Sequence, residues 1–236
     1  MSVKPWIGQL AEPENHNPVN KEKTDCTYNL EYVYGYRSAD SRQNVHFNNA
    51  GNAVYMTAAL GVVLDHGSNT QKFFGGGEVD NTSKQVASDQ DHHTNDIMCC
   101  KVNKDRSKCV TGQVGSAPTV FVWDACSGNK IARCKLPKGC RGVNAVDFSD
   151  CSGMIACVDL HNEHQVHVFD ANSGEAKGMQ KGDANKIHDI AWDKRSGSSR
   201  FATAGSKHMC FWDAKGGADL GKNKQCNRKN SRCLKL

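Results

Sequence analysis

The pentapeptide VFVWD, at Val120–Asp124, ends an apolar run with an aromatic residue and an aspartate. The arrangement returns as VHVFD at Val166–Asp170 and as MCFWD at Met209–Asp213, with the aromatic residues 46 and 43 positions apart. Each pentapeptide follows a second apolar landmark, and these landmarks are spaced 46 and 44 apart: Ile97–Val102, Val143–Phe148 and Ile187–Trp192. Two landmarks that repeat in register indicate one structural unit used three times.

Between the two landmarks lie runs rich in small residues: Cys109–Gly112, Ile155–Val158 and Phe201–Gly205. A weaker fourth run follows in two repeats, at Lys130–Leu136 and Glu175–Met179. A period in the mid-forties with four short strands and a Trp-Asp dipeptide is typical of a WD40 blade. Strands that are buried on both faces contain continuous apolar residues without alternation, and the inner runs here show this pattern. A generic antiparallel sandwich has short strands too, but it does not repeat two landmarks in register.

We therefore predict an all-β chain that forms part of a WD40-type β-propeller. Three aspartates, Asp124, Asp170 and Asp213, end the third strand of a repeat, where a carboxylate can accept hydrogen bonds from turn amides. His93 lies just before the first repeat and is expected to be a hydrogen-bonding residue of that blade. The later repeats lack this histidine, so their internal networks must differ.

Composition excludes several classes of protein. The chain has 236 residues, of which 38% are hydrophobic and 23% charged, which argues against collagen, a coiled coil and a wholly disordered chain. The longest apolar run, Ala58–Leu64, is far shorter than the roughly 20 residues that cross a bilayer. The first residues lack the layout of a secretion signal. We expect an unexported chain without a membrane partner.

The twelve cysteines show no pair with the two-residue gap of a zinc or redox motif. Five lie in strand-like runs, where a thiol acts as a small buried hydrophobe: Cys99, Cys100, Cys109, Cys157 and Cys210. We predict reduced, structural cysteines and a cytosolic compartment.

The net charge of +5 is concentrated at one end. After Asp219 come six basic residues and no acidic one, and the rest of the chain holds 24 basic against 25 acidic residues. The basic character therefore belongs to a tail rather than to a broad face.

Ahead of the repeats stands LEYVYGYRSADSRQNV, Leu30–Val45, followed by Gly51–Tyr55 and Leu60–Leu64. This region resembles the HELP motif (hydrophobic EMAP-like protein motif) of the echinoderm microtubule-associated protein-like family. Further points of agreement extend the resemblance over about residues 28 to 225: His93–Arg106, Thr111–Gln113, Asn162–His164 and Gly205–Trp212.

The resemblance implies a HELP segment built into the propeller core, two linked propellers in the full domain, and association with microtubules or tubulin without enzymatic activity. Two features depart from the family. Residues 1–27 are polar and lack the heptads of its coiled coil, and the chain holds only about four blades. The polar run Gln225–Arg232 leaves the last blade without a convincing fourth strand. We expect the front half of such a protein: a fragment, a truncated gene model or a chain that a partner completes.

The predicted organisation has five parts. An extended polar segment (1–27) precedes the HELP segment or first blade (28–74), an inserted surface loop (75–91), three WD40-like blades (92–220) and a basic tail (221–236). The loop begins Gly75-Gly76-Gly77, but no Lys-Ser or Lys-Thr follows, so a phosphate-binding loop is not indicated.

Catalytic motifs are absent from the sequence: it has no nucleophile elbow, no His-Glu-x-x-His and no dinucleotide fingerprint. The runs Asp91–His93 and His161–His164 each lack a third ligand at a credible spacing. We predict no enzyme, no cofactor and no metal.

The leading hypothesis is a microtubule-binding scaffold of the cytoskeleton, with a ciliary axoneme as one setting and other cytoskeletal or axonemal proteins as further partners. Its candidate contacts are Arg37, Arg42, Lys222, Lys224, Arg228, Lys229 and Arg232. For Arg37 and Arg42 the alternative is internal pairing with Asp40 or Glu31. Tyr34 and Tyr36 are expected in the core.

The alternative function is a generic WD-repeat adaptor that is not bound to microtubules. RNA binding ranks last because residues 222–235 contain no aromatic for base stacking, which leaves only non-specific phosphate attraction.

Overall fold

The computed structural model describes residues 29–42, 44–76, 91–115, 118–214 and 221–227, with residues 8, 11, 13–15 and 17–22 nearer the N-terminus. For residues 221–227 only the backbone is described. Within these residues the chain forms four four-stranded sheets, and we call them the first to fourth blades in chain order.

The first blade holds β1 (Val45–Phe47), β2 (Ala53–Thr57), β3 (Leu60–Asp65) and β4 (Thr70–Phe74). The second holds β5 (Ile97–Val102), β6 (Lys108–Gln113), β7 (Thr119–Asp124) and β8 (Lys130–Lys135). The third holds β9 (Val143–Phe148), β10 (Met154–Asp159), β11 (Val166–Asp170) and β12 (Ala176–Gln180). The fourth holds β13 (Ile187–Trp192), β14 (Arg200–Gly205), β15 (His208–Asp213) and β16 (Gly221–Asn227).

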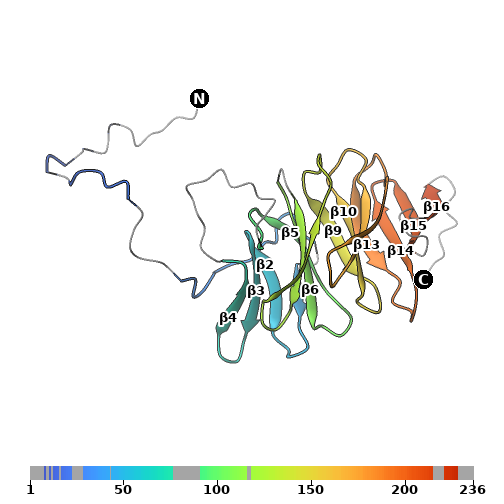
Figure 1. The fold of residues 1–236 in the computed structure, drawn as a ribbon, viewed down its shortest axis with the longest axis horizontal. Helices are drawn as coiled ribbons and strands as arrows, with labels where there is room; N and C mark the ends of the chain where they lie inside the picture. Colours follow the sequence, from blue (N-terminus) through green and yellow to red (C-terminus); the bar gives the residue numbers. More distant parts are fainter. Residues whose placement is uncertain are drawn as a thin grey trace.

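Each blade is an antiparallel meander whose strands pair in chain order. Strands β5, β9 and β13, the first strands of successive blades, lie side by side. Figure 1 shows the four sheets in a row, with the first and fourth at opposite ends. The all-β prediction and the repeat of blade-like sheets are confirmed, and the described residues form an open arc without ring closure.

The two middle blades are buried on both faces. The first five residues of β7 and the first four of β11 are all buried, which explains why these strands read as apolar without alternation. In the fourth blade β15 alternates instead: Cys210 and Trp212 are buried, whereas Met209 and Phe211 are 39% and 43% exposed. The same repeat therefore produces two burial patterns, according to how many neighbours a blade has.

The apolar core lies between the blades in three clusters, one for each pair of neighbours. Between the first two blades Phe74 stacks on Trp123, with ring centroids 5.5 Å apart and an interplanar angle of 5°. Gly61 of β3 makes room for this indole, because a Cβ there would lie 2.6 Å from it. The Trp-Asp dipeptide of the repeat thus supplies the inter-blade contact.

The aspartates that end third strands bind the following turn, as predicted. Asp124 accepts from the amides of Cys126 and Ser127, and Asp170 accepts from those of Asn172 and Ser173. Asp213 accepts instead from the Ser199 hydroxyl at 2.6 Å, and residues 215–220, which follow Ala214, lie outside the described part. The first blade has a counterpart that sequence reasoning missed, since Asp65 accepts from the amides of Gly67 and Ser68.

His93 is a buried hydrogen-bonding residue of the second blade, as predicted. Its ring nitrogens lie 2.8 Å from Gln113 Oε1 and 2.7 Å from Thr111 Oγ1, and Trp123 Nε1 donates to the same hydroxyl at 3.1 Å. The later blades use other networks. The fourth blade keeps the Trp–Thr part, in which Trp212 Nε1 donates to Thr203 Oγ1 at 2.9 Å.

The five cysteines expected in strands are all buried, and the nine cysteines whose side chains the structure describes are free thiols. The sulfur atoms of Cys100 and Cys109 lie 3.4 Å apart across β5 and β6. Burial raises the pKa of Cys99 and Cys109 well above the usual value of a thiol, as expected for structural thiols.

One prediction about the end of the chain is wrong. Residues Gly221–Asn227 form β16, which pairs with β15 along its length, so the last blade has its fourth strand despite the polar sequence. An outermost strand is paired on one edge only, and backbone hydrogen bonds can place it there without apolar side chains. The inserted loop at 75–91 lies mostly outside the described residues.

Helices long and apolar enough for a membrane crossing are absent from the described ranges.

Candidate functional site

Arg37 is paired internally. Its guanidinium binds Asp40 through Nε and Nη2, both at 2.7 Å, and reaches Asp96 through Nη1 at 2.8 Å. Its backbone amide donates to Met56 O. These contacts tie residues 29–42, the first part of the HELP segment, to the first blade and to the loop before β5. Of the two carboxylates considered as partners, Asp40 is confirmed, and Asp96 was not foreseen.

A glutamine from β4 holds the preceding part of the HELP segment. The Gln71 amide accepts from Val33 N at 2.8 Å and donates to Val33 O at 3.0 Å, in the manner of a strand neighbour. It also donates to the Tyr55 hydroxyl at 2.9 Å. The segment 29–42 is thereby attached to the blade although it contains no strand of its own.

The prediction that Tyr34 and Tyr36 lie in the core is wrong. Tyr34 is 87% exposed and Tyr36 is 54% exposed, because the segment runs over the surface of the blade and only some of its side chains face inward. Tyr32 is the half-buried member of the run: its hydroxyl donates to Asn69 Oδ1, and its ring lies 5.0 Å from that of Tyr34. The exposed rings make this a candidate contact surface.

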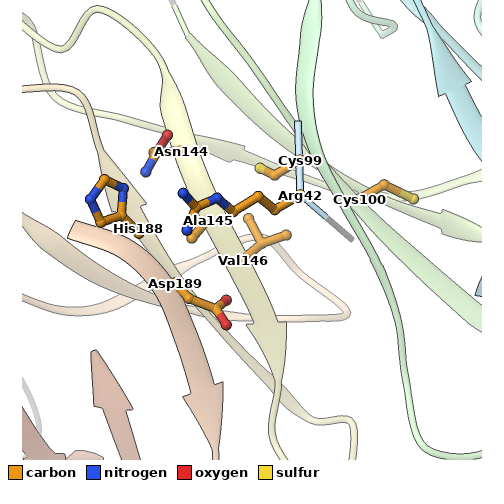
Figure 2. A pocket seen from close by; sticks show the side chains of 8 residues that line it. All are labelled: Arg42, Cys99, Cys100, Asn144, Ala145, Val146, His188 and Asp189. Carbon is orange, nitrogen blue, oxygen red and sulfur yellow. The ribbon is translucent and has the colours of Figure 1, made fainter. Parts of the chain in front are cut away.

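Arg42 occupies a different place from Arg37. It is exposed and lines a small cavity of about 20 Å³ together with residues of the first strands of three blades: Cys99, Cys100, Asn144, Ala145, Val146, His188 and Asp189. Figure 2 shows its guanidinium extending toward Asn144 and His188, with Cys99 and Cys100 on the other side. The HELP segment therefore places a cation across the inner edge of the arc.

Other titratable side chains lie near Arg42. His188 bonds Ser206 Oγ at 2.9 Å through Nε2, and its pKa is lowered by burial and by the neighbouring charges of Arg42 and Lys186. The carboxylate of Asp189 lies at the same cavity. A guanidinium at an exposed edge can form two parallel hydrogen bonds with a carboxylate, so this edge suits an acidic partner group.

The remaining candidate contacts lie near the C-terminus. Lys222 and Lys224 belong to β16, where they pair with Trp212 and Phe211 in the backbone register. Arg228, Lys229 and Arg232 lie outside the described residues. Arg37 and Arg42 thus lie on one segment but at different places, and Lys222 and Lys224 lie on the fourth blade.

The histidine runs considered as metal ligands are separated by the fold. His93 is used inside the second blade, whereas the Nδ1 atom of His164 lies 3.0 Å from Asp183 O. Among the described residues, side chains of metal-ligating type gather instead at Cys140, Asp159 and His167, which sequence spacing did not reveal.

Comparison with known proteins identifies a HELP motif at residues 25–62. The chain is 48% identical over 225 residues to the ciliary WD repeat-containing protein ctxp80 of Euplotoides octocarinatus, an alignment that covers 95% of this chain and 31% of that protein. It is 27% identical over 212 residues to human echinoderm microtubule-associated protein-like 4, covering 86% of this chain and 20% of that protein. Human echinoderm microtubule-associated protein-like 3 is 29% identical over 213 residues, covering 86% and 23%.

The resemblance seen in the sequence is therefore confirmed: this is a HELP-motif chain whose homologues are EMAP-like proteins and a ciliary WD repeat protein. None of these relatives carries the name of an enzyme. The chain spans between a fifth and a third of the length of these relatives.

Proposed function

We propose that this chain is a scaffold that associates with microtubules in the cytoskeleton of the cilium, where it contacts tubulin and neighbouring axonemal proteins. The observation that carries the proposal is the 48% identity to a ciliary WD repeat protein across 95% of the chain. The names of the more distant relatives add microtubule association.

The charge distribution suits such a role. Tubulin surfaces are acidic, and exposed cations supply a long-range attraction that salt weakens. Arg42 offers a cation at the inner edge of the arc, and the tail offers six more after Asp219. Arg37 is the weaker candidate because two carboxylates already occupy its guanidinium. The proposed division places the HELP segment at 28–74, the three WD40-like blades at 92–220 and the basic tail at 221–236.

The direct test is cosedimentation of the full chain with stabilised microtubules at low and high salt. We expect binding that weakens as salt is raised. Arg42→Glu should reduce the affinity several-fold, and replacing Arg228, Lys229 and Arg232 by glutamine should reduce both the affinity and its salt dependence. Lys72→Gln, at an exposed position on β4, is the matched control and should bind normally. A folded chain that stays in the supernatant at low salt would rule out direct binding.

A second candidate function is an adaptor that docks other proteins on its exposed blade faces. It is favoured by the bare faces of the two end blades. In β1 the His46 ring bonds Cys100 O of the second blade, so Val45 and Phe47 point the other way, where they are 45% and 57% exposed. Met209 and Phe211 are their counterparts on the fourth blade.

Another blade-like sheet, from a longer form of the chain or from a partner, would cover these faces in the way that the middle blades are covered. Purification from cell extract after microtubules are depolymerised separates the two functions. Recovery of a stoichiometric partner other than tubulin supports the adaptor, whereas loss of all partners together with the microtubules supports the scaffold.

A further inference from the structure

Three side chains of different chemistry meet inside the third blade. Cys140 lies three residues before β9, Asp159 ends β10 and His167 is the second residue of β11. All three are buried, with 3%, 0% and 2% of their surfaces exposed. Cys140 Sγ lies 3.0 Å from Asp159 Oδ2, and His167 Nε2 lies 2.9 Å from the same oxygen. The three ligand atoms are all within 4.8 Å of one another.

Asp159 is held firmly in this position. Its other oxygen, Oδ1, accepts from the amides of His161 at 2.9 Å and Gln165 at 2.8 Å, so the loop between β10 and β11 closes over the carboxylate. A thiol and an imidazole therefore converge on one oxygen atom whose orientation the backbone fixes. Such support of a ligand by a surrounding hydrogen-bond shell is what metal sites require.

The second blade offers a comparison, because its residue at the position of Asp159 belongs to a purely structural hydrogen-bond network. Gln113, 46 residues before Asp159, sits at the end of β6 and bonds His93, which completes a neutral network. The third blade places a carboxylate there instead. A buried carboxylate needs hydrogen-bond partners, and Asp159 has His167 Nε2 at 2.9 Å and Cys140 Sγ at 3.0 Å from Oδ2. Thus the third blade combines an anion with two further side chains that bind transition metals.

A divalent cation fits the charge of this cluster. Cys140 would lose its thiol proton to solvent, and the resulting thiolate together with the Asp159 carboxylate would carry two negative charges that a divalent cation neutralises, while His167 binds as a neutral imidazole. Tetrahedral Zn–S, Zn–N and Zn–O bonds place the donors about 3.4 to 3.6 Å apart. The two short separations of 3.0 and 2.9 Å would therefore open by about half an ångström.

We propose that Cys140, Asp159 and His167 bind a divalent metal ion of the zinc class through Sγ, Oδ2 and Nε2. Sulfur and imidazole ligands favour Zn²⁺ or Co²⁺ over Mg²⁺ and Ca²⁺, which prefer oxygen. Three protein ligands leave the fourth tetrahedral position to a water or to a group from a bound partner. The ion would cross-link the loop before β9 with the ends of β10 and β11, and so stiffen one edge of the third blade.

The test uses the full chain, freed of metal with a chelator, refolded with and without Zn²⁺, and dialysed. We expect one zinc per chain by elemental analysis, a melting temperature raised by zinc, and proton release on binding, because Cys140 must lose its thiol proton. Substitution with Co²⁺ should give tetrahedral d–d bands and a thiolate-to-cobalt charge-transfer band. Absence of stoichiometric metal after refolding with zinc would overturn the proposal.

Two conservative variants separate a metal site from a hydrogen-bond network. Cys140→Ser and His167→Gln each keep a donor for Asp159, so a purely structural network should tolerate them and remain indifferent to zinc. The proposal predicts that either variant weakens zinc binding by at least about tenfold, that Cys140→Ser removes the charge-transfer band, and that neither melts higher with zinc. Cys151→Ser, an exposed cysteine in the β9–β10 turn, should behave like the unmodified chain. If Cys140→Ser keeps the thiolate band, the metal is bound by other cysteines and the assignment is wrong.

Discussion

At the scale of single residues, each blade has its own polar network within a similar apolar frame. In the second blade the Thr111 hydroxyl serves two neighbours, His93 and Trp123. In the fourth blade Thr203 bonds Trp212, and no histidine of the His93 type is present. Both threonines are fully buried, which makes them a matched pair.

Replacing Thr111 and Thr203 by valine, one at a time, should therefore give unequal losses of stability. A buried polar group left without a partner costs about 1 to 3 kcal/mol. Thr111→Val leaves two buried groups without a partner, one on His93 and one on Trp123, whereas Thr203→Val leaves only Trp212 Nε1. We therefore expect the unfolding free energy to fall further for Thr111→Val. Denaturant titration of both variants is the measurement. Equal losses, or the reverse order, would show that the His93 contact carries no net stability.

The burial of His93 also predicts a pH dependence of stability. Burial lowers its pKa from 6.5 to about 4, with Gln113 acting in the opposite direction. As pH falls below 6.5 the unfolded chain takes up a proton that the folded chain refuses until about pH 4. Stability should therefore decrease across this window, by about 2 kcal/mol between pH 7 and pH 5.

His93→Gln removes this titration and is the control for the pH effect. The variant should be less stable at pH 7, and its deficit relative to the unmodified chain should shrink toward pH 5. Denaturant titrations at the two pH values provide the comparison. Parallel curves for the two proteins would mean that His93 is not the titrating group.

At the scale of elements, residues 29–42, the first part of the HELP segment, contain no strand and are attached largely through side chains, beside the backbone bond from Arg37 N to Met56 O. Gln71 provides two hydrogen bonds to the backbone of Val33, and Arg37 provides ion pairs to Asp40 and Asp96. Partly exposed ion pairs contribute little, about 0 to 1 kcal/mol each. We infer that Gln71 is the main attachment of the first half of the segment.

Gln71→Ala should release residues 29–36 while leaving the blades intact. We expect faster amide exchange at Val33 and faster proteolytic cleavage in this region, with a change in global unfolding free energy of only about 1 kcal/mol. Lys72→Ala, the exposed neighbour on β4, should leave both rates unchanged. Unaltered protection of Val33 in the Gln71 variant would show that the segment is held by other contacts.

At the scale of the whole molecule, glycines in the turns after third strands allow neighbouring blades to approach. Gly128 and Gly174, 46 residues apart, both have positive φ, of 79° and 76°. A Cβ on Gly128 would lie 2.5 Å from Phe73 O of the first blade. One on Gly174 would overlap the Arg133 carbonyl of the second blade. The repeat thus encodes a contact between blades as well as the blade itself.

Comparing Gly174→Ala with Gly197→Ala separates the cost of backbone strain from the cost of steric overlap between the new methyl group and the neighbouring blade. Gly197 also has positive φ, of 71°, but nothing lies within 4 Å of the position a Cβ would take. A left-handed conformation costs an alanine about 1 to 2 kcal/mol. We expect about that loss for Gly197→Ala and at least twice as much for Gly174→Ala, measured by denaturant titration. Similar losses would indicate that the blades separate to admit the methyl group at little cost.

Much of the architecture could be predicted from local patterns. The period of the Trp-Asp or Phe-Asp pentapeptides located three blades, the aspartates after third strands identified two of the turns that they bind, and His93 was correctly read as an internal hydrogen-bonding residue. These predictions were correct because each depends on residues close in sequence or on burial, which apolar runs indicate directly.

The wrong predictions concern residues whose position depends on contacts with other parts of the chain. β16 is polar, yet it forms by pairing with β15, and Tyr34 is aromatic, yet it is exposed because the segment lies on a surface that Gln71 and Arg37 define. Cys140, Asp159 and His167 are separated by 19 and 8 residues and lie on different strands or loops, so no spacing rule joins them. The sequence by itself determined the repeat and most of its strands, because hydrophobic periodicity is a local property, and its motifs carried the resemblance to HELP-motif proteins. Only the tertiary structure decided which side chains face one another, because strand pairing and blade packing bring distant residues together.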